Sequence, residues 1–168
     1  PSADVSPTGD SATATAQANW YLAHEHLGRL PVGRVHPAAA GTVGIDLGTT
    51  HSLVGVVDSG FPILLADTDG SRLTPSVVHY AGDGTVTVGA KALRQRALDP
   101  ERTVISVKRL IGRREAEGDW RPPYDLAAIG KSAVDVSADL LRHVEGTAER
   151  ALDSEVTRAV VAVPAYCN

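Results

Sequence analysis

The stretch Gly44-Ile45-Asp46-Leu47-Gly48-Thr49-Thr50-His51-Ser52 decides the fold and the candidate site of this chain. An aspartate lies inside an apolar strand and is followed by a glycine and two threonines. Side chains alternate between the faces of a strand, so the apolar residues share one face and Asp46 lies between two glycines on the other. Because glycine has no side chain, that second face lets a bulky anionic ligand approach the backbone closely.

The carboxylate of Asp46 predicts that a cation takes part in binding the anion, since a carboxylate alone repels phosphate. Mg²⁺ with its retained waters is the natural candidate. The hydroxyls and turn amides of Gly48, Thr49 and Thr50 can donate hydrogen bonds to phosphate oxygens, and His51 adjoins them. An ordinary β-turn with a half-buried aspartate explains the same residues about equally well. A P-loop does not, because neither Gly-Lys-Ser/Thr nor a helix start follows.

The composition is that of one globular domain. The 168 residues suffice for a hydrophobic core, and 43% of them are apolar. With a net charge of −4 and no apolar run long enough to span a bilayer, neither nucleic acid nor a membrane is an expected partner. The single cysteine, Cys167, favours a reducing compartment, and the N-terminus lacks the layout of a secretory signal. We therefore expect a cytoplasmic protein.

Both ends of the sequence predict a fragment of a longer protein. The chain contains no methionine, and it stops directly after a strand-like apolar run. Residues 1–40 are rich in small and polar residues and in proline, so we expect a disordered tail and linker there. The folded part is expected to begin near Gly41.

Alternating apolar residues and turn residues predict an antiparallel meander followed by helices. The expected strands cover residues 42–48, 51–58, 61–66, 76–80 and 85–88, with Asp83-Gly84 as the hairpin turn into the last of them. The expected helices cover residues 90–98, 101–111 and 137–152, the last with Ser137 as its N-cap. Residues 115–136 are expected to be irregular, and a fully buried strand is expected at 158–163.

Lys108 is the second candidate for chemistry. In the expected helix 101–111 it lies one turn from Val104 and Ile111, within the apolar sector of that helix. A lysine on a buried face either extends its ammonium group to solvent or meets an anion. A lone lysine more often does the former, but a phosphate-binding hairpin in the same chain favours the latter.

Five segments, taken together and in order, resemble the 70-kilodalton heat-shock chaperones, the DnaK-type family. The resemblance covers roughly residues 42–168, which makes it far more specific than a lone motif. The segment Pro75-Ser76-Val77-Val78-His79-Tyr80 is similar to the branch of the family that serves iron–sulfur cluster assembly. The five matching segments are Ile45 to Ser52, Arg72 to Val78, Val88 to Lys91, Ser106 to Arg113 and Val161 to Tyr166.

This resemblance implies an α/β protein with a mixed sheet, the actin-like ATPase fold with its ribonuclease H-like motif. Only the first lobe of that fold is expected. Its base subdomain covers about residues 41–77 and 132–168, and an inserted upper subdomain covers about 78–131. The resemblance further implies an ATP-dependent chaperone that acts in protein folding and the stress response. Its expected partners are client proteins, a J-domain co-chaperone, a nucleotide exchange factor and an iron–sulfur scaffold protein.

The family pattern also implies roles for individual residues with ATP, ADP and Mg²⁺ as cofactors. Asp46 helps to position hydrated Mg²⁺, and Lys108 reaches the γ-phosphate and the attacking water. Pro164 relays the nucleotide state towards the client-binding domain. The phosphate contacts fall to the turn residues Gly48, Thr49, Thr50 and His51.

The chain departs from the family pattern in three places. His51 replaces an asparagine or tyrosine, which introduces a donor whose charge varies with pH. The segment 114–136 is short, so a hairpin of the upper subdomain is expected to be trimmed. Cys167 replaces a phenylalanine. Because the second phosphate hairpin and the adenine pocket lie outside this sequence, we expect the fragment alone neither to hydrolyse ATP nor to bind it tightly.

Two other functions are compatible with parts of the same sequence. A sugar kinase or an actin-like filament protein has a similar Asp-Leu-Gly-Thr hairpin, although the segments around Lys108 and Pro164 argue against both. A degenerate nucleotide-binding module that does not hydrolyse ATP is supported only by His51 and the short segment 114–136.

Overall fold

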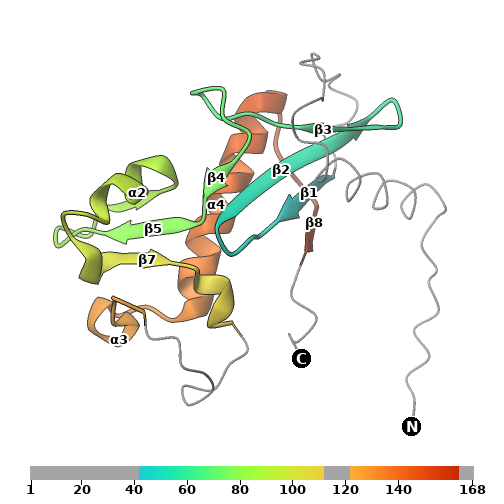
Figure 1. The fold of residues 1–168 in the computed structure, drawn as a ribbon. Helices are drawn as coiled ribbons and strands as arrows, with labels where there is room; N and C mark the ends of the chain where they lie inside the picture. Colours follow the sequence, from blue (N-terminus) through green and yellow to red (C-terminus); the bar gives the residue numbers. More distant parts are fainter. Residues whose placement is uncertain (1–41, 112–121, 163–168) are drawn as a thin grey trace, which may run out of the picture.

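The computed structural model describes residues 42–111 and 122–162, which form two sheets and a long helix (Figure 1). The expected tail and linker over residues 1–40 therefore lie outside the described residues, as do Pro164 and Cys167. Among the described residues, no helix combines the length and the apolar character needed to cross a bilayer.

The first sheet has five strands and contains the hairpin of the candidate site. Its main path has the order β3-β2-β1-β8, and β4 pairs with the start of β2. Strands β1 to β3 are antiparallel, as the meander predicted, and β8 lies parallel to β1. The bounds are β1 (Val43–Asp46), β2 (His51–Asp58), β3 (Phe61–Leu64), β4 (Thr74–Pro75) and β8 (Ala159–Ala162). This mixed sheet confirms the predicted α/β fold class.

The second sheet has three antiparallel strands in the order β6-β5-β7. Its bounds are β5 (Val77–Tyr80), β6 (Val86–Val88) and β7 (Thr103–Ile105), with helix α2 (Ala90–Gln95) between β6 and β7 in the chain. The expected hairpin turn between β5 and β6 is present, with Gly84 at a φ of 86°. The one-turn helices are η2 (Pro100–Arg102), η3 (Val107–Arg109) and α3 (Leu126–Ile129).

Helix α4 (Ala133–Leu152) runs behind the junction of the two sheets (Figure 1). Its N-cap is Ser132, five residues before Ser137, which the sequence predicted as the N-cap. The Ser132 hydroxyl accepts from the backbone N–H of Asp135, whose carboxylate accepts from the backbone N–H of Ser132 in return. Ser137 instead donates its hydroxyl to the carbonyl of Ala133 inside the helix. The prediction that residues 115–136 are irregular is therefore wrong for α3 and for the start of α4.

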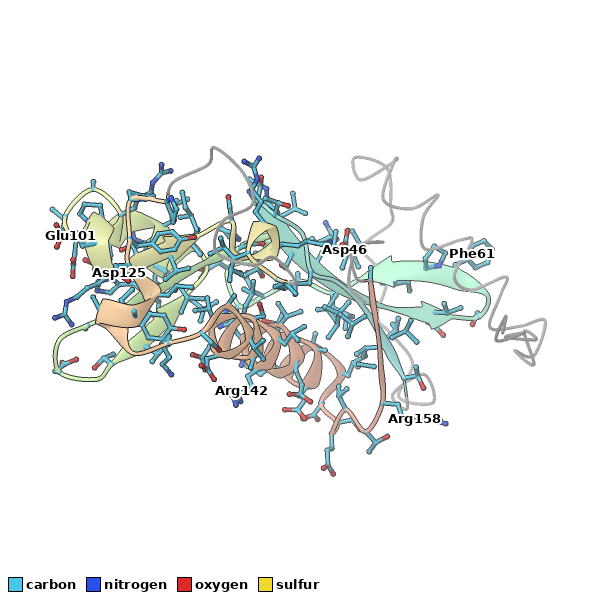
Figure 2. The ribbon with its side chains drawn as sticks, turned by 90° about the horizontal axis from the view of Figure 1, so that it is seen from below. Asp46, Phe61, Glu101, Asp125, Arg142 and Arg158 are labelled. Atoms are coloured by element: carbon cyan, nitrogen blue, oxygen red, sulfur yellow. The ribbon has the colours of Figure 1, made fainter. Side chains whose placement is uncertain are left out.

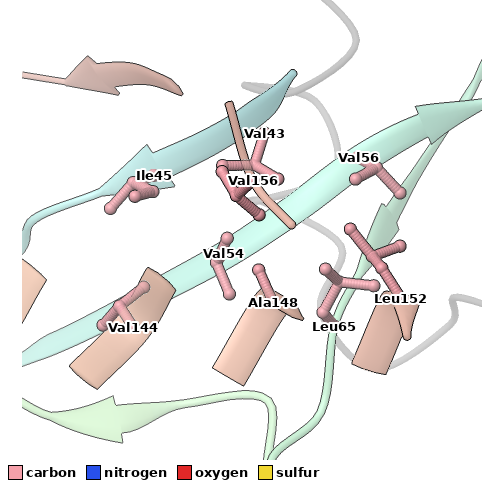
Figure 3. Close-up of a cluster of buried hydrophobic side chains, with 9 residues drawn as sticks. All are labelled: Val43, Ile45, Val54, Val56, Leu65, Val144, Ala148, Leu152 and Val156. Carbon is pink, nitrogen blue, oxygen red and sulfur yellow. The ribbon is translucent and has the colours of Figure 1, made fainter. Parts of the chain in front are cut away.

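Two hydrophobic clusters hold the sheets to α4. The first joins the inner faces of β1 and β2 to the C-terminal half of α4, as Figure 3 shows. The second joins β5, β7 and η3 to the N-terminal half of α4. Leu141 and Val161 pack against both clusters. The apolar face of α4 therefore forms the shared core of the two sheets.

The predicted helix over residues 101–111 is wrong. This segment folds as η2, then strand β7, then η3. The β-branched run Thr103-Val104-Ile105 pairs with β5, which favours an extended backbone over a helix. Ser106 then adopts a left-handed conformation with a φ of 54°, which ends the strand and turns the chain into η3.

The sequence predicts a fully buried strand at residues 158–163. The strand is present as β8, but it is not fully buried. Within the described residues, β8 pairs with β1 on one side only and forms the edge of the sheet. Val160 in this strand is 47% exposed. The uninterrupted apolar sequence indicated a strand correctly, but it could not specify how many neighbours that strand has.

Candidate functional site

The hairpin that joins β1 to β2 has the two faces predicted from the sequence. Val43, Ile45 and Leu47 are buried in the core, whereas Asp46 points from the other face and its side chain is 25% exposed. Gly48 lies in the turn, where a Cβ atom would overlap the carbonyl oxygen of His51. The turn therefore requires glycine at this position, and the bare surface beside Asp46 follows from that requirement.

Lys108 approaches this hairpin from the second sheet. Its Nζ lies 3.9 Å from Oδ1 of Asp46, and its side chain is 17% exposed. This distance is too long for a hydrogen bond, so the contact is Coulombic. Figure 2 shows Asp46 in the middle of the molecule, between its two parts. The lysine therefore faces a carboxylate across the junction of the two sheets.

The placement of Lys108 depends on its neighbours in η3. Val107 is buried in the second cluster, where η3 packs against α4. Ser106 supplies the left-handed turn that lets Val107 enter this cluster directly after β7. The ammonium group is therefore positioned by strand β7, the turn at Ser106 and the buried side chain of Val107. The amphipathic helix predicted from the sequence is not formed.

The remaining predicted residues lie on the outer side of the same turn. Thr49 is half-buried, and the side chains of Thr50 and His51 are exposed. The backbone carbonyl of Thr50 accepts a hydrogen bond from the N–H of Ser76, 2.9 Å away. The structure brings together all five predicted hairpin residues, Asp46 and Gly48 to His51. Lys108 reaches the same place from η3, beyond the second sheet in the chain.

The donor set fits a hydrated Mg²⁺ that shares its coordination with phosphate. Within residues 42–111 and 122–162, no group of three or more His, Cys, Asp or Glu side chains could hold an ion by itself. One carboxylate on a glycine-lined face, with hydroxyls and turn amides beside it, offers oxygen ligands to a cation that keeps most of its waters. The cationic Lys108 beside Asp46 adds a positive charge for phosphate.

Sequence reasoning missed two serines that support this hairpin. Ser52 and Ser76 are 0% and 2% exposed, and their hydroxyl oxygens lie 2.9 Å apart. The sequence did contain a signal, because Ser52 opens the apolar run Leu53 to Val57 and Ser76 directly precedes Val77-Val78. A hydroxyl at the start of a buried strand must find a partner inside the protein.

The comparison with protein families agrees with this geometry. The sequence profile of the family described as "Hsp70 protein" matches residues 42–168. The chain belongs to the Hsp70 family, whose members are chaperones that bind nucleotide and have the actin-like ATPase fold. Its described residues correspond to the N-terminal part of that fold, which confirms the resemblance found in the sequence.

Several proteins named as chaperones or heat-shock proteins are similar to this chain. It is 45% identical over 137 residues to "Chaperone protein HscA homolog" of Methylobacillus flagellatus, which covers 74% of this chain and 22% of the relative. It is 46% identical over 139 residues to the protein of the same name from Azotobacter vinelandii, with the same coverage. "Stromal 70 kDa heat shock-related protein, chloroplastic" of Pisum sativum is 43% identical over 143 residues, 75% of this chain and 20% of the relative. The chain thus spans about a fifth of the length of these relatives.

Proposed function

We propose that this chain supplies the first phosphate-binding hairpin of an ATP-dependent molecular chaperone. In this proposal the parent protein binds Mg-ATP and couples its hydrolysis to the binding and release of client proteins. The observation that carries the proposal is the 3.9 Å contact between Lys108 and Asp46, which brings a cation and a carboxylate to the glycine-lined face of the hairpin.

Each residue of the site has a distinct role in this proposal. Asp46 holds the hydrated Mg²⁺, which when bound supplies positive charge to the phosphate oxygens. The turn residues Gly48 to His51 donate hydrogen bonds from backbone amides and side chains to those oxygens. Lys108 orients the attacking water and stabilises the negative charge that grows on the γ-phosphate. Pro164, which lies outside the described residues, remains the proposed relay to the client-binding part.

The wider context of the parent protein is also proposed. Support comes from the resemblance to the branch that serves iron–sulfur cluster assembly and from the relatives named HscA homolog. The expected partners are client proteins, a J-domain co-chaperone, a nucleotide exchange factor and an iron–sulfur scaffold protein. We place the protein in the cytoplasm, although the pea relative is named as a stromal chloroplast protein.

The decisive experiment replaces the matching segment of the Methylobacillus relative with residues 42–168 of this chain and measures single-turnover ATP hydrolysis. We expect Lys108→Ala to lower the hydrolysis rate roughly 100-fold or more, because it removes a charge that acts in the transition state. The affinity for Mg-ATP should change less. Lys91→Ala, which alters an exposed lysine on α2, is the matched control and should leave the rate unchanged.

A degenerate module is the alternative that this experiment separates. If the chimera binds Mg-ATP but Lys108→Ala leaves its rate unchanged, the hairpin binds nucleotide without taking part in hydrolysis. A companion measurement uses the 168-residue chain alone. Calorimetric titration with Mg-ATP should show no sub-micromolar affinity, because one hairpin provides only part of the expected phosphate contacts.

A further inference from the structure

Residues 74–76, which precede β5, bond to the outer side of the turn in the β1–β2 hairpin, here called the phosphate hairpin. Strand β4 pairs with the first two residues of β2, with His51 opposite Pro75 and Ser52 opposite Thr74. The backbone N–H of Ser76 then donates to the carbonyl of Thr50, at 2.9 Å. Residues 74–76 therefore form a short clamp along the outer part of the turn.

A buried pair of hydroxyls reinforces this clamp. Oγ of Ser52 and Oγ of Ser76 lie 2.9 Å apart and are almost completely excluded from solvent. Burial of hydroxyls costs free energy unless they bond to each other or to another partner, so the pair is favourable only when both residues keep this register. A slip of β4 along β2 would separate the two hydroxyls and leave each without this bond.

The opposite side of the turn is equally constrained. The carbonyl oxygen of His51 lies against the Cα of Gly48, where no side chain fits. The backbone from Thr50 to His51 is therefore enclosed between Gly48 on one side and Ser76 on the other. The carbonyl of Thr50 is thus fixed by a hydrogen bond, and that of His51 leaves no room for a side chain at position 48.

We propose that Ser76 is a positioning residue for the phosphate hairpin. Together with its buried partner Ser52, it holds the carbonyl of Thr50 and so keeps the turn in one conformation before a phosphate binds. Such preorganisation raises affinity because the turn does not have to become ordered on binding. This inference rests on the proposed function, because it assigns the clamp to the same phosphate site.

The first test needs no nucleotide. Amide hydrogen exchange at residue 76 reports directly on the bond to Thr50, and alanine retains that N–H. In the 168-residue chain, Ser76→Ala should accelerate exchange at residue 76 about tenfold beyond any change in global unfolding, as local opening implies. Ser137→Ala removes another buried serine hydroxyl, inside α4, and should leave exchange at residue 76 unchanged. Unchanged exchange in Ser76→Ala would overturn the proposal.

The second test separates positioning from ordinary core packing. In the chimera with the Methylobacillus relative, Ser76→Ala should raise the Kd for Mg-ATP roughly three- to tenfold, the scale of one lost hydrogen bond, and change kcat little. The double variant Ser52→Ala/Ser76→Ala leaves no lone hydroxyl, so it should recover stability but not affinity. Recovery of both would assign the pair to packing alone and overturn the proposal.

Failure of the proposed function gives a different result. If the unmutated chimera does not bind Mg-ATP, the phosphate site itself is wrong and the assignment of Ser76 to it falls as well. Accelerated exchange at residue 76 in the Ser76→Ala variant of the 168-residue chain would still show that Ser76 holds the turn.

Discussion

The phenol of Tyr80 on β5 donates a hydrogen bond to Oδ2 of Asp139 on α4, at 2.8 Å, and so joins the second sheet to the helix that both sheets share. Asp139 also accepts from Nη1 of Arg142 at 2.7 Å and lies 3.6 Å from Nζ of Lys131. The ammonium group of Lys131 lies 5.2 Å from the centre of the Tyr80 ring. Burial first, and then Asp139, raises the pKa of the Tyr80 phenol, which therefore stays protonated and able to donate.

Tyr80→Phe tests the energy of this junction. We expect the free energy of unfolding to fall by about 1–2 kcal/mol, because the charged carboxylate loses a donor but keeps its two basic neighbours. Urea unfolding of the 168-residue chain measures this loss. In an Asp139→Ala background, which removes the acceptor, the same substitution should cost clearly less, as a double-mutant cycle will show. Equal costs in both backgrounds would mean that the two side chains do not interact.

Gly48→Ala and Gly146→Ala are predicted to have opposite effects. At Gly48 a Cβ atom would overlap the backbone of His51, so we expect a loss of about 1–3 kcal/mol, as for other overpacked sites. At Gly146, inside α4, a Cβ atom would lie 3.2 Å from the flexible end of the Arg150 side chain, which can move away. Alanine there should stabilise the helix by roughly 0.5–1 kcal/mol. Chemical denaturation of both variants will show whether the signs differ.

The N-terminus of α4 provides a third prediction. Ser132→Ala should destabilise the chain by about 1 kcal/mol, because it removes the hydroxyl that caps the N–H of Asp135. Ser132→Gly should cost only a few tenths of a kcal/mol, since glycine is itself an acceptable N-cap. The melting temperatures of the two variants, measured by thermal unfolding, will show which substitution destabilises the chain more. If alanine were no worse than glycine, the capping box would contribute nothing to stability.

His143 is expected to lower the free energy of unfolding as the pH falls. The pKa of this half-buried imidazole lies below its ordinary value of 6.5, first because of burial and then because of Arg150 and Lys91, while Asp67 opposes the shift. The unfolded chain therefore binds the proton first as the pH falls, and stability is lost from about pH 6.5 downwards to the folded pKa. At neutral pH the contribution is fully present.

His143→Gln isolates this effect. Urea unfolding at pH 7.5 and pH 5.5 should show a smaller loss of stability in the variant than in the unmutated chain. Asp83 and Asp135 have pKa values below their ordinary 3.8, so their proton binding falls outside this interval. An identical pH dependence in the variant would exclude His143 as the source.

The local parts of the fold could be predicted from the sequence. Alternation along residues 43–47 identified both the buried face and the exposed Asp46, because a strand fixes the direction of each side chain within a few residues. Asp83-Gly84 likewise identified a hairpin turn. The family was recognisable because five short segments occur in one order over the length that the family profile matches.

The predictions that are wrong concern segments whose structure depends on residues outside the segment. The segment 101–111 has apolar residues at helical spacing, yet pairing with β5 makes Thr103 to Ile105 a strand. Ser137 has the residue type of an N-cap, but Ser132 has a reciprocal partner in Asp135 and starts the helix earlier. The helix predicted around Lys108 is wrong, and the structure nevertheless places its ammonium group 3.9 Å from Asp46.

The separate attachment of Asp46 and Lys108 has a mechanical consequence. Asp46 ends β1 in the first sheet, whereas Lys108 follows β7 of the second sheet. A rotation of one sheet against the other that separates these two elements would lengthen the 3.9 Å contact. Coulomb energy varies inversely with distance, so doubling the gap halves the attraction. The distance between the two charged groups therefore reports the angle between the sheets. The distance between two labels, one on each sheet, would report the same angle in solution.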